Sequence, residues 1–128
     1  MHISVVTLFP DMLGALERSG ITGRAMADGL VTMSVIDPRD FATDKHRTVD
    51  DRPYGGGPGM VLMYEPMSRA VAAARARCQG EPSVVGLSPQ GRRMVQADVD
   101  ALAGGGDFVL VCGRYEGFDE RLTRRHFN

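Results

Sequence analysis

The sequence predicts an α/β fold in which a parallel sheet carries helices on both faces. Short apolar runs at residues 3–8, 31–36, 83–87 and 108–111 are typical of buried strands. Segments with helical periodicity or with strong helix formers lie between these runs. Strands that alternate with helices form parallel sheets through right-handed crossovers, so these observations together favour one sheet of four strands.

The helices are expected from their apolar spacing and from the residues that end them. Pro10 suits the first turn of a helix, Met12 and Leu16 form an apolar stripe, and Gly20 is expected to end this helix. The segment 37–52 is dense in charge and has no periodicity, so we expect a loop there. Four further helices are expected, at 22–27, 67–77, 97–102 and 116–126.

Length and composition are those of one globular domain. The 128 residues carry a formal net charge of −1, and 43% of them are hydrophobic and 24% charged. No apolar run approaches the roughly 20 residues of a membrane span, and the first residues do not resemble a secretion signal. Cys78 and Cys112 provide neither a disulfide framework nor a four-cysteine zinc site. We therefore predict a reduced, cytoplasmic protein without a membrane segment or a metal site.

Arginine is unusually frequent in this chain. It accounts for fourteen of the 15 basic residues, and Lys45 is the single lysine. The planar guanidinium matches phosphate groups and base edges, which fits a nucleic-acid ligand. A GC-rich genome would also favour arginine, together with the alanine, glycine and valine that are abundant here. The near-neutral net charge argues against a broad basic face but not against a local one.

Three segments that follow predicted strands carry residues suited to ligand binding: 50–60, 87–92 and 112–117. In a parallel sheet the carboxyl ends of the strands lie at one edge, where ligands bind. Glycines there let the backbone approach a ligand closely. Six of the seven residues in 53–59 are Gly or Pro, yet this segment matches neither the dinucleotide-binding nor the phosphate-loop pattern.

Each of these residues can also be explained by a structural role alone, without any part in ligand binding or catalysis. A glycine cluster is commonly a tight turn, and Asp50, Asp51 and Arg52 are typical of a solvated charged turn. Glu116 stands at the start of the predicted last helix, where the helix dipole stabilises a carboxylate. Cys112, at a strand end, is commonly a small buried hydrophobic residue.

Six segments, taken in order, resemble one family. The longest is residues 46–60, HRTVDDRPYGGGPGM, and the resemblance runs from residue 1 to about 121. The shorter segments are Leu8-Phe9-Pro10, Gly23-Arg24-Ala25, Asp37-Pro38-Arg39-Asp40, Leu87-Ser88-Pro89-Gln90-Gly91 and Cys112-Gly113-Arg114-Tyr115-Glu116-Gly117. Together they are similar to the TrmD family of bacterial tRNA (guanine-N1)-methyltransferases, and a fifteen-residue motif of this kind is highly specific.

The resemblance implies a fold, an activity and partners. It implies a SPOUT-type α/β fold with a deep trefoil knot, in a homodimer. It also implies transfer of a methyl group from S-adenosylmethionine to N1 of the guanosine just 3′ of the tRNA anticodon. Guanine N1 carries a proton at neutral pH, so a base must remove that proton as the methyl group arrives. The target lies in the single-stranded anticodon loop, where a base can be splayed out and recognised by its edges.

The resemblance implies roles for residues of this chain as well. Glu116 matches a carboxylate that helps catalysis, and Gly113 is the residue most expected to contact the cofactor. Arg47, Arg52 and Arg114 are candidates for phosphate or base contacts. The expected cofactor-binding residues are Ser88, Pro89, Gln90, Gly91, Cys112, Gly113, Arg114, Tyr115 and Gly117. The expected substrate-binding residues are Asp50, Arg52, Tyr54, Gly55, Gly56, Gly57, Pro58 and Gly59.

The sequence departs from the family at its end. Family members continue for about as long again, so residues 1–128 are expected to be the N-terminal part of the methyltransferase domain. The knot-forming segment, the third cofactor loop, the aspartate usually assigned as base and the C-terminal tRNA-binding domain are then expected beyond residue 128. Gly86 stands where an aromatic residue is common. Two other interpretations stay open: a catalytically inactive fragment that binds cofactor or dimerises, and an unrelated nucleotide-binding α/β protein.

Overall fold

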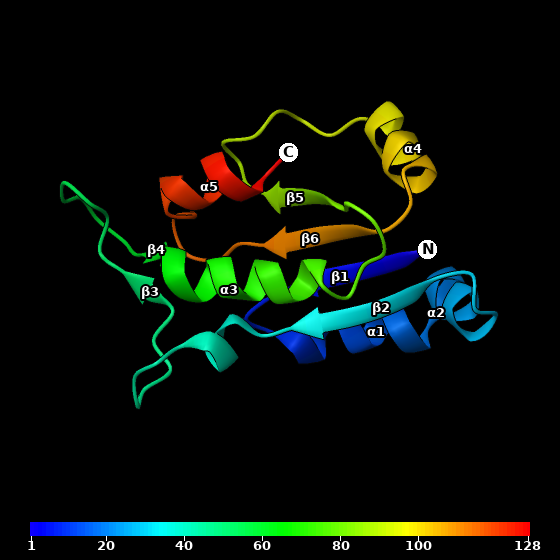
Figure 1. The fold of residues 1–128 in the computed structure, drawn as a ribbon, viewed down its shortest axis with the longest axis horizontal. Coiled ribbons are helices and arrows are strands. Elements are labelled where there is room, and N and C mark those ends of the chain that lie inside the picture. Colours follow the sequence, from blue (N-terminus) through cyan, green and yellow to red (C-terminus); the bar gives the residue numbers. More distant parts are fainter.

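The computed structural model describes residues 1–128, and its centre is a four-stranded parallel sheet (Figure 1). The strands are β1 (His2–Val6), β2 (Thr32–Ile36), β5 (Ser83–Leu87) and β6 (Phe108–Cys112). They lie in the order β2-β1-β6-β5, so the central pair joins two strands that are far apart in the sequence. Val6 lies opposite Val111 in this pair and opposite Ile36 in the pair with β2.

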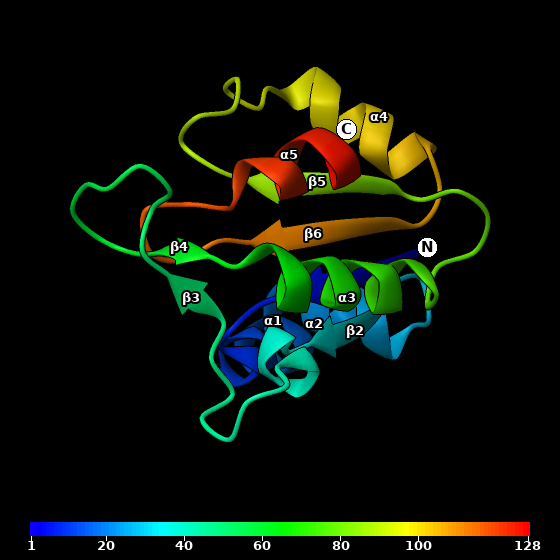
Figure 2. The same cartoon turned by 60° about the vertical axis from the view of Figure 1, so that its left-hand side comes forward.

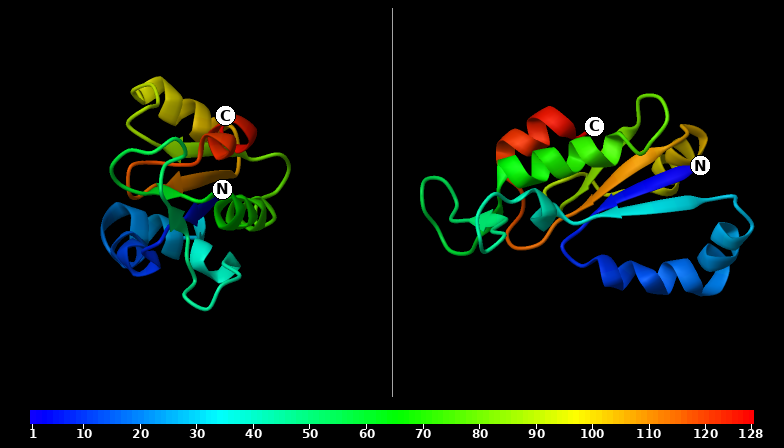
Figure 3. Two further views of the ribbon diagram at one scale, coloured as in Figure 1. Left: turned by 90° about the vertical axis from the view of Figure 1, so that its left-hand side faces the viewer. Right: turned by 60° about the horizontal axis from the view of Figure 1, so that its bottom comes forward.

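Helices lie on both faces of the sheet. They are α1 (Gly14–Arg18), α2 (Gly20–Ala27), α3 (Tyr64–Arg75), α4 (Gln96–Gly104) and α5 (Glu120–His126), with 3₁₀ turns at Pro10–Leu13 and Pro38–Phe41. Figure 3 shows α3 and α5 on one face and α1 with α2 on the other. The helices pack against the two faces of the sheet to different extents, because five residues of α3 are buried whereas none of α2 is.

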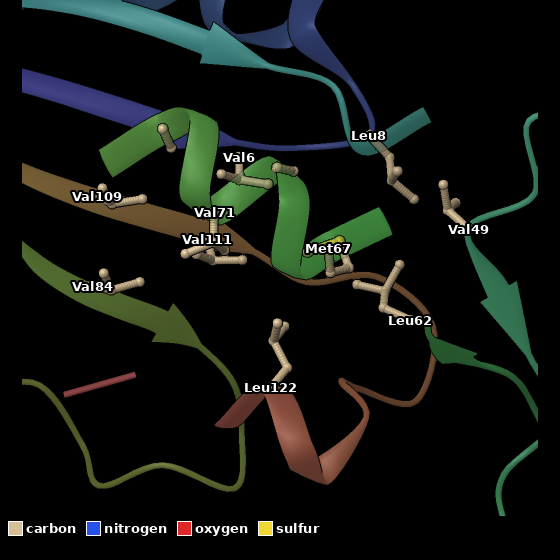
Figure 4. Close-up of a cluster of buried hydrophobic side chains, with 12 residues drawn as sticks. Val6, Leu8, Val49, Leu62, Met67, Val71, Val84, Val109, Val111 and Leu122 are labelled. Carbon is tan, nitrogen blue, oxygen red and sulfur yellow. The ribbon is translucent and has the colours of Figure 1, made fainter. Parts of the chain in front are cut away.

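The hydrophobic core lies between α3 and the sheet (Figure 4). Alternate residues of a strand face the same side, and Val84, Val109 and Val111 of neighbouring strands all turn toward α3 and are fully buried. Leu122 of α5 points into the same cluster. The buried residues of α3 are Pro66, Met67, Ala70, Val71 and Ala74, whose small members let the helix lie close to the strands.

A second, two-stranded sheet carries the glycine-rich segment. Strands β3 (Asp50–Asp51) and β4 (Val61–Leu62) pair antiparallel, with Asp50 opposite Leu62. Figure 2 shows the loop between them extending away from the main sheet. Val49 and Leu62 belong to the core, so the base of this hairpin is fixed while its tip stands free.

The predicted α/β class, the parallel sheet and the four strands are confirmed. The strand at Ser83–Leu87 has the predicted bounds, and the other three differ by one or two residues at one or both ends. Two expectations in the first half of the chain are wrong. Gly20 does not end the first helix: the chain already breaks at the extended Ser19, and Gly20 (φ +65°) begins α2. The segment 37–52 is not only loop, because it contains the turn Pro38–Phe41 and β3.

The start of the last helix is also predicted wrongly. Helix α5 begins at Glu120, so Glu116 does not lie in its first turn. The carboxylate of Asp119 caps this helix instead by accepting a hydrogen bond of 2.9 Å from the backbone N–H of Arg121. The dipole of α5 therefore does not explain the presence of a carboxylate at Glu116.

No helix in the structure combines the length and the apolar character needed to cross a bilayer. Both cysteines are free, and burial raises the pKa of the Cys78 and Cys112 thiols. Cys112 at the end of β6 thus packs as a small apolar side chain with little thiolate at neutral pH. No group of His, Cys, Asp or Glu side chains is arranged to hold a metal ion.

The packing of α5 predicts the effect of truncating Leu122. Leu122→Ala should lower the free energy of unfolding by about 2–5 kcal/mol, because it leaves a cavity in the core. Urea unfolding followed by circular dichroism measures this, with Leu30→Ala as the control because Leu30 is 68% exposed. A loss at Leu122 no larger than the loss at Leu30 would contradict the packing of α5 against α3.

Candidate functional site

The four parallel strands end at one edge of the sheet, and the predicted site loops begin there. Strands β5 and β6 are neighbours, with Leu87 directly opposite Cys112. The next residues, Ser88 and Gly113, therefore begin two loops that leave the sheet side by side. The structure thus brings together the two segments that were expected to bind the cofactor.

The loop after β5 is a tight turn followed by a clamped segment. The Gly91 N–H donates to the Ser88 carbonyl at 3.1 Å, and the Gln90 N–H donates to the Ser88 hydroxyl at 3.2 Å. Arg92 then donates two hydrogen bonds of 2.7 Å to the Asp98 carboxylate, which also accepts from the N–H of Val95. These bonds lower the pKa of Asp98 to about 2. The loop is therefore anchored to α4 at its far end.

A cavity of about 600 Å³ lies beside this loop. Its lining joins the loop to β5, α4 and α5, and it includes Ser88, Gln90 and Gly91 among the residues expected to bind cofactor. Gly113, Arg114 and Glu116 are not part of the lining. The ring of Phe127 fills the space beside Gly86, where a Cβ atom would lie 2.2 Å from it.

The loop after β6 has its own packing constraint. A Cβ atom on Gly113 would lie 2.8 Å from the ring of Phe118, so the absence of a side chain at residue 113 lets that ring pack. Phe118 in turn meets Phe127 edge-on, with 5.2 Å between ring centroids. Tyr115 has φ +60°, a conformation that few residues other than glycine adopt, and its side chain is half-exposed. This loop is therefore tightly shaped by its own residues.

Glu116 is held by the glycine-rich segment. Its backbone N–H donates to the Met60 carbonyl at 2.9 Å, and the Leu62 N–H donates to the Gly117 carbonyl at the same distance. The Asp119 N–H closes a third bond, of 3.0 Å, to the Leu62 carbonyl. A Cβ atom on Gly59 would lie 2.3 Å from Cγ of Glu116, so the Glu116 side chain lies directly against the Gly59 backbone. Two segments of the motif, far apart in the sequence, are thus joined by backbone hydrogen bonds.

The tip of the glycine-rich segment lies away from the contact between Gly59 and Glu116. Tyr54 is fully exposed, and Cβ atoms added to Gly55, Gly56 and Gly57 would meet nothing within 4 Å. These three glycines have positive φ angles of 86°, 89° and 118°, which is why the turn requires them. Of the expected substrate-binding residues, Gly59 lies against Glu116, whereas the tip residues project into open space.

The arginines near the site differ in what they contact. Arg47 forms an ion pair with Asp40 and a hydrogen bond to the Arg39 carbonyl, so its guanidinium is already engaged. Arg52 is exposed and forms none of the structure's ion pairs. Arg114 stacks on the ring of Phe9, with 5.1 Å between its Cζ atom and the ring centroid. Neither Phe9 nor Arg39, which stacks on the same ring, was expected in the site, because the sequence does not state which strands are neighbours.

Comparison with known proteins gives the family. A family model described as "tRNA (Guanine-1)-methyltransferase TrmD" matches residues 1–128. The chain belongs to the TrmD family. A relative from Shewanella piezotolerans, named tRNA (guanine-N(1)-)-methyltransferase, is 55% identical over 124 residues, which are 97% of this chain and 50% of the relative. A relative of the same name from Photobacterium profundum is 48% identical over 125 residues, which are 98% of this chain and 50% of the relative.

A solved structure of a tRNA methyltransferase has the same fold. It is described as the crystal structure of tRNA (m1G37) methyltransferase from Aquifex aeolicus. The two structures align with a TM-score of 0.85 and 36% sequence identity, over 97% of this chain and 56% of the other. The chain spans about half the length of the curated relatives that it matches. The predicted family and fold are therefore confirmed.

The contact between Gly59 and Glu116 predicts that alanine substitutions at two glycines lower the free energy of unfolding by different amounts. Gly59 and Gly55 have similar φ angles of 82° and 86°, but only a Cβ on Gly59 would strike another side chain. Both Gly→Ala changes should cost about 1–2 kcal/mol from backbone strain, and Gly59→Ala should cost about 1–3 kcal/mol more from overpacking. Urea unfolding of the two variants measures the difference.

A double variant checks the cause of the larger loss. Glu116→Ala removes the Cγ atom, so Gly59→Ala in that background should cost no more than Gly55→Ala does in the original chain. An unchanged excess cost in the double variant would show that the Glu116 side chain does not lie over Gly59.

The pKa of Asp98 predicts how the loop after β5 responds to acid. The folded-state pKa of about 2 lies below the ordinary value of 3.8, so the Asp98 carboxylate contributes its full stabilisation above about pH 4–5. That contribution is lost as the pH falls through about 2. The Val95 amide signal in an NMR titration should therefore move with a midpoint near pH 2, and Asp98→Asn should abolish this step. Asp100→Asn, in the same helix, should leave it unchanged, and a Val95 midpoint near 3.8 would contradict the clamp.

Proposed function

We propose that this chain provides the donor-binding loops and the target-base loop of a tRNA (guanine-N1)-methyltransferase. The reaction transfers a methyl group from S-adenosylmethionine to N1 of the guanosine just 3′ of the anticodon. The observation that carries the proposal is the junction of three motif segments at one sheet edge. The loops after β5 and β6 begin on directly paired residues, and Glu116 is bonded to the glycine-rich segment through Met60.

The residues of this edge fit S-adenosylmethionine. The turn at Ser88–Gly91 presents backbone groups and glycine beside a cavity of about 600 Å³, which is within the usual size of small-molecule sites of about 300–1,000 Å³. Leu87 is 45% exposed at the start of this turn and offers apolar surface for a purine. In the proposal, Ser88, Pro89, Gln90 and Gly91 hold one side of the cofactor. The backbone of residues 112–115 and of Gly117, which lie outside the lining of this cavity, holds the other.

When bound, S-adenosylmethionine supplies an electrophilic methyl group on a positively charged sulfur. The task of this chain is then mainly orientation, because the methyl group, the sulfur and guanine N1 must lie in line. Loops fixed on a rigid sheet are suited to that task. The Glu116 carboxylate is proposed to accept a hydrogen bond from the exocyclic amino group of guanine and so to leave N1 free and turned toward the methyl group. In this chain the N1 proton leaves to solvent water; the aspartate that the resemblance implies as base is expected beyond residue 128.

The target guanosine is proposed to enter from the side of the glycine-rich segment. Asp50, Arg52 and the residues Tyr54–Gly59 lie on or beside the hairpin that carries this segment. Its tip is open to solvent, and the exposed Tyr54 ring can stack on an unpaired base of the anticodon loop. Backbone groups at the glycines can then hydrogen-bond to base edges.

We propose a cytoplasmic homodimer as the working form. Support comes from exposed apolar side chains on the turn Pro10–Leu13 and on α1 and α2. Met12, Leu16 and Ile21 are 74%, 48% and 86% exposed there. Clustered exposed apolar residues favour an interface over bare solvent contact. A second interpretation is an inactive fragment that binds cofactor or dimerises.

A methyl-transfer assay separates these interpretations. The 128-residue chain is incubated with labelled S-adenosylmethionine and an unmodified tRNA transcript, and label at N1 of the target guanosine is measured. The proposal predicts methylation of this transcript and none of a transcript with adenosine at that position. Glu116→Gln should reduce the rate by about 10²-fold or more, as the loss of a group that positions and polarises the reacting base does. Lys45→Gln, at an exposed residue outside the expected site, should leave the rate unchanged.

The outcomes are distinct. Binding of S-adenosylmethionine by calorimetry without methyl transfer would overturn catalysis by this chain and support the inactive fragment. Absence of both binding and transfer, with the chain folded by circular dichroism, would overturn the proposal in full.

A further inference from the structure

Two guanidinium groups stack on one aromatic ring at the carboxyl edge of the sheet. The Cζ atom of Arg114 lies 5.1 Å from the centroid of the Phe9 ring, and that of Arg39 lies 5.9 Å from it. Both distances are within the range of an attractive cation–π contact, which is about 6 Å. Phe9 is 41% exposed, so this group of three side chains lies at the surface.

The sheet order explains why these three side chains meet. Phe9 follows β1, Arg39 follows β2, and Arg114 follows β6. The strands are neighbours in the order β2-β1-β6, and all three end at the same edge. The ring from the middle strand thus receives one arginine from the strand on each side.

The two arginines have different electrostatic surroundings. Arg39 is already neutralised, because its guanidinium lies 3.7 Å from the Asp37 carboxylate and donates a 2.6 Å hydrogen bond to the Leu8 carbonyl. Arg114 is exposed, takes part in none of the structure's eight ion pairs, and donates no side-chain hydrogen bond. Stacking uses the flat face of a guanidinium and leaves its N–H edge for an oxyanion. Arg114 is therefore a cation that is oriented but not neutralised.

We propose that Phe9 is a positioning residue that holds Arg114 to bind a phosphodiester of the tRNA anticodon loop. This inference rests on the proposed function and adds to it a residue with no assigned role and the chemical group that it serves. Arg39, which also lies over the Phe9 ring, is itself held by its ion pair with Asp37 and its hydrogen bond to the Leu8 carbonyl. Arg114 lies two residues from Glu116, so the phosphate that it binds belongs to a nucleotide close to the target base.

An oxyanion near Arg114 can come from two sources, an RNA phosphate or the carboxylate of S-adenosylmethionine. The two sources can be distinguished by which ligand binds more weakly when Arg114 is changed, and by whether the salt dependence of RNA binding changes. Each phosphate contact to single-stranded nucleic acid contributes about 0.7 to the slope of log affinity against log salt. Loss of the cofactor carboxylate contact would instead weaken cofactor binding and leave the RNA slope unchanged.

The experiment measures binding of an unmodified anticodon stem-loop RNA at several salt concentrations. Arg114→Gln should weaken binding about tenfold at low salt and lower the slope by about 0.7. Phe9→Leu should shift both quantities in the same direction, whereas Phe9→Tyr keeps the ring and should retain them. Arg77→Gln is the matched control, because Arg77 is exposed, forms no ion pair and lies between α3 and β5, away from this edge.

A second measurement reports the stacking without RNA. In the NMR spectrum of the free chain, the side-chain signals of Arg114 should carry a ring-current shift that Phe9→Leu removes and Phe9→Tyr preserves. Absence of this shift would overturn the positioning role whatever the RNA data show.

The binding outcomes separate the inference from the proposed function. Unchanged slope in Arg114→Gln, with RNA still bound by the original chain, would overturn the phosphate contact and leave the proposed function standing. Weakened S-adenosylmethionine binding with an unchanged RNA slope would assign Arg114 to the cofactor carboxylate and also overturn it. Failure of the original chain to bind RNA would contradict both.

Discussion

The parallel pairing of β1 with β6 is the contact on which the rest of the structure depends. It joins Ile3–Val6 to Phe108–Val111, two segments about a hundred residues apart in the sequence, and forms the middle of the sheet. Because the pair is central, β2 and β5 can add only on its two outer sides. Every strand then ends at one edge, where the loops of the candidate site leave the sheet. The core under α3 is built on the same pair, through Val6, Val109 and Val111.

A second constraint acts within the site. The main sheet alone would leave the hairpin of β3 and β4 independent of the loop after β6. Three backbone hydrogen bonds between Met60–Leu62 and Glu116–Asp119 prevent this, and Gly59 makes room for the Glu116 side chain. A carboxylate at the surface is thereby given a fixed place beside a loop whose tip is open. Fixed reactive groups beside an accessible loop suit a reaction that depends on orientation.

The sequence predicted the strands well because their burial requires continuous apolar runs, as in Ile3–Leu8 and Ser83–Leu87. It could not predict strand order, since pairing depends on contacts between distant segments. The hairpin was missed because each of its strands has two residues, too few for a periodic pattern.

The site was predicted from motifs, and its geometry was only partly predictable. The last helix was expected to begin at Glu116, but the structure begins it at Glu120, with Asp119 as its N-cap. The stacking of Phe9 with Arg39 and Arg114 needed the strand order β2-β1-β6 and could not be foreseen from residues in three separate segments. The tip residues Tyr54–Gly57, although highly characteristic in sequence, contact nothing that would have revealed their place.

We propose that the loops after β5 and β6 form one binding surface for the methyl donor. An NMR titration of the labelled chain with S-adenosylmethionine tests this. The amide signals of Ser88–Gly91 and of Gly113–Gly117 are expected to shift together, with one dissociation constant. Shifts confined to one loop, or centred on residues away from the carboxyl edge of the sheet, would contradict it.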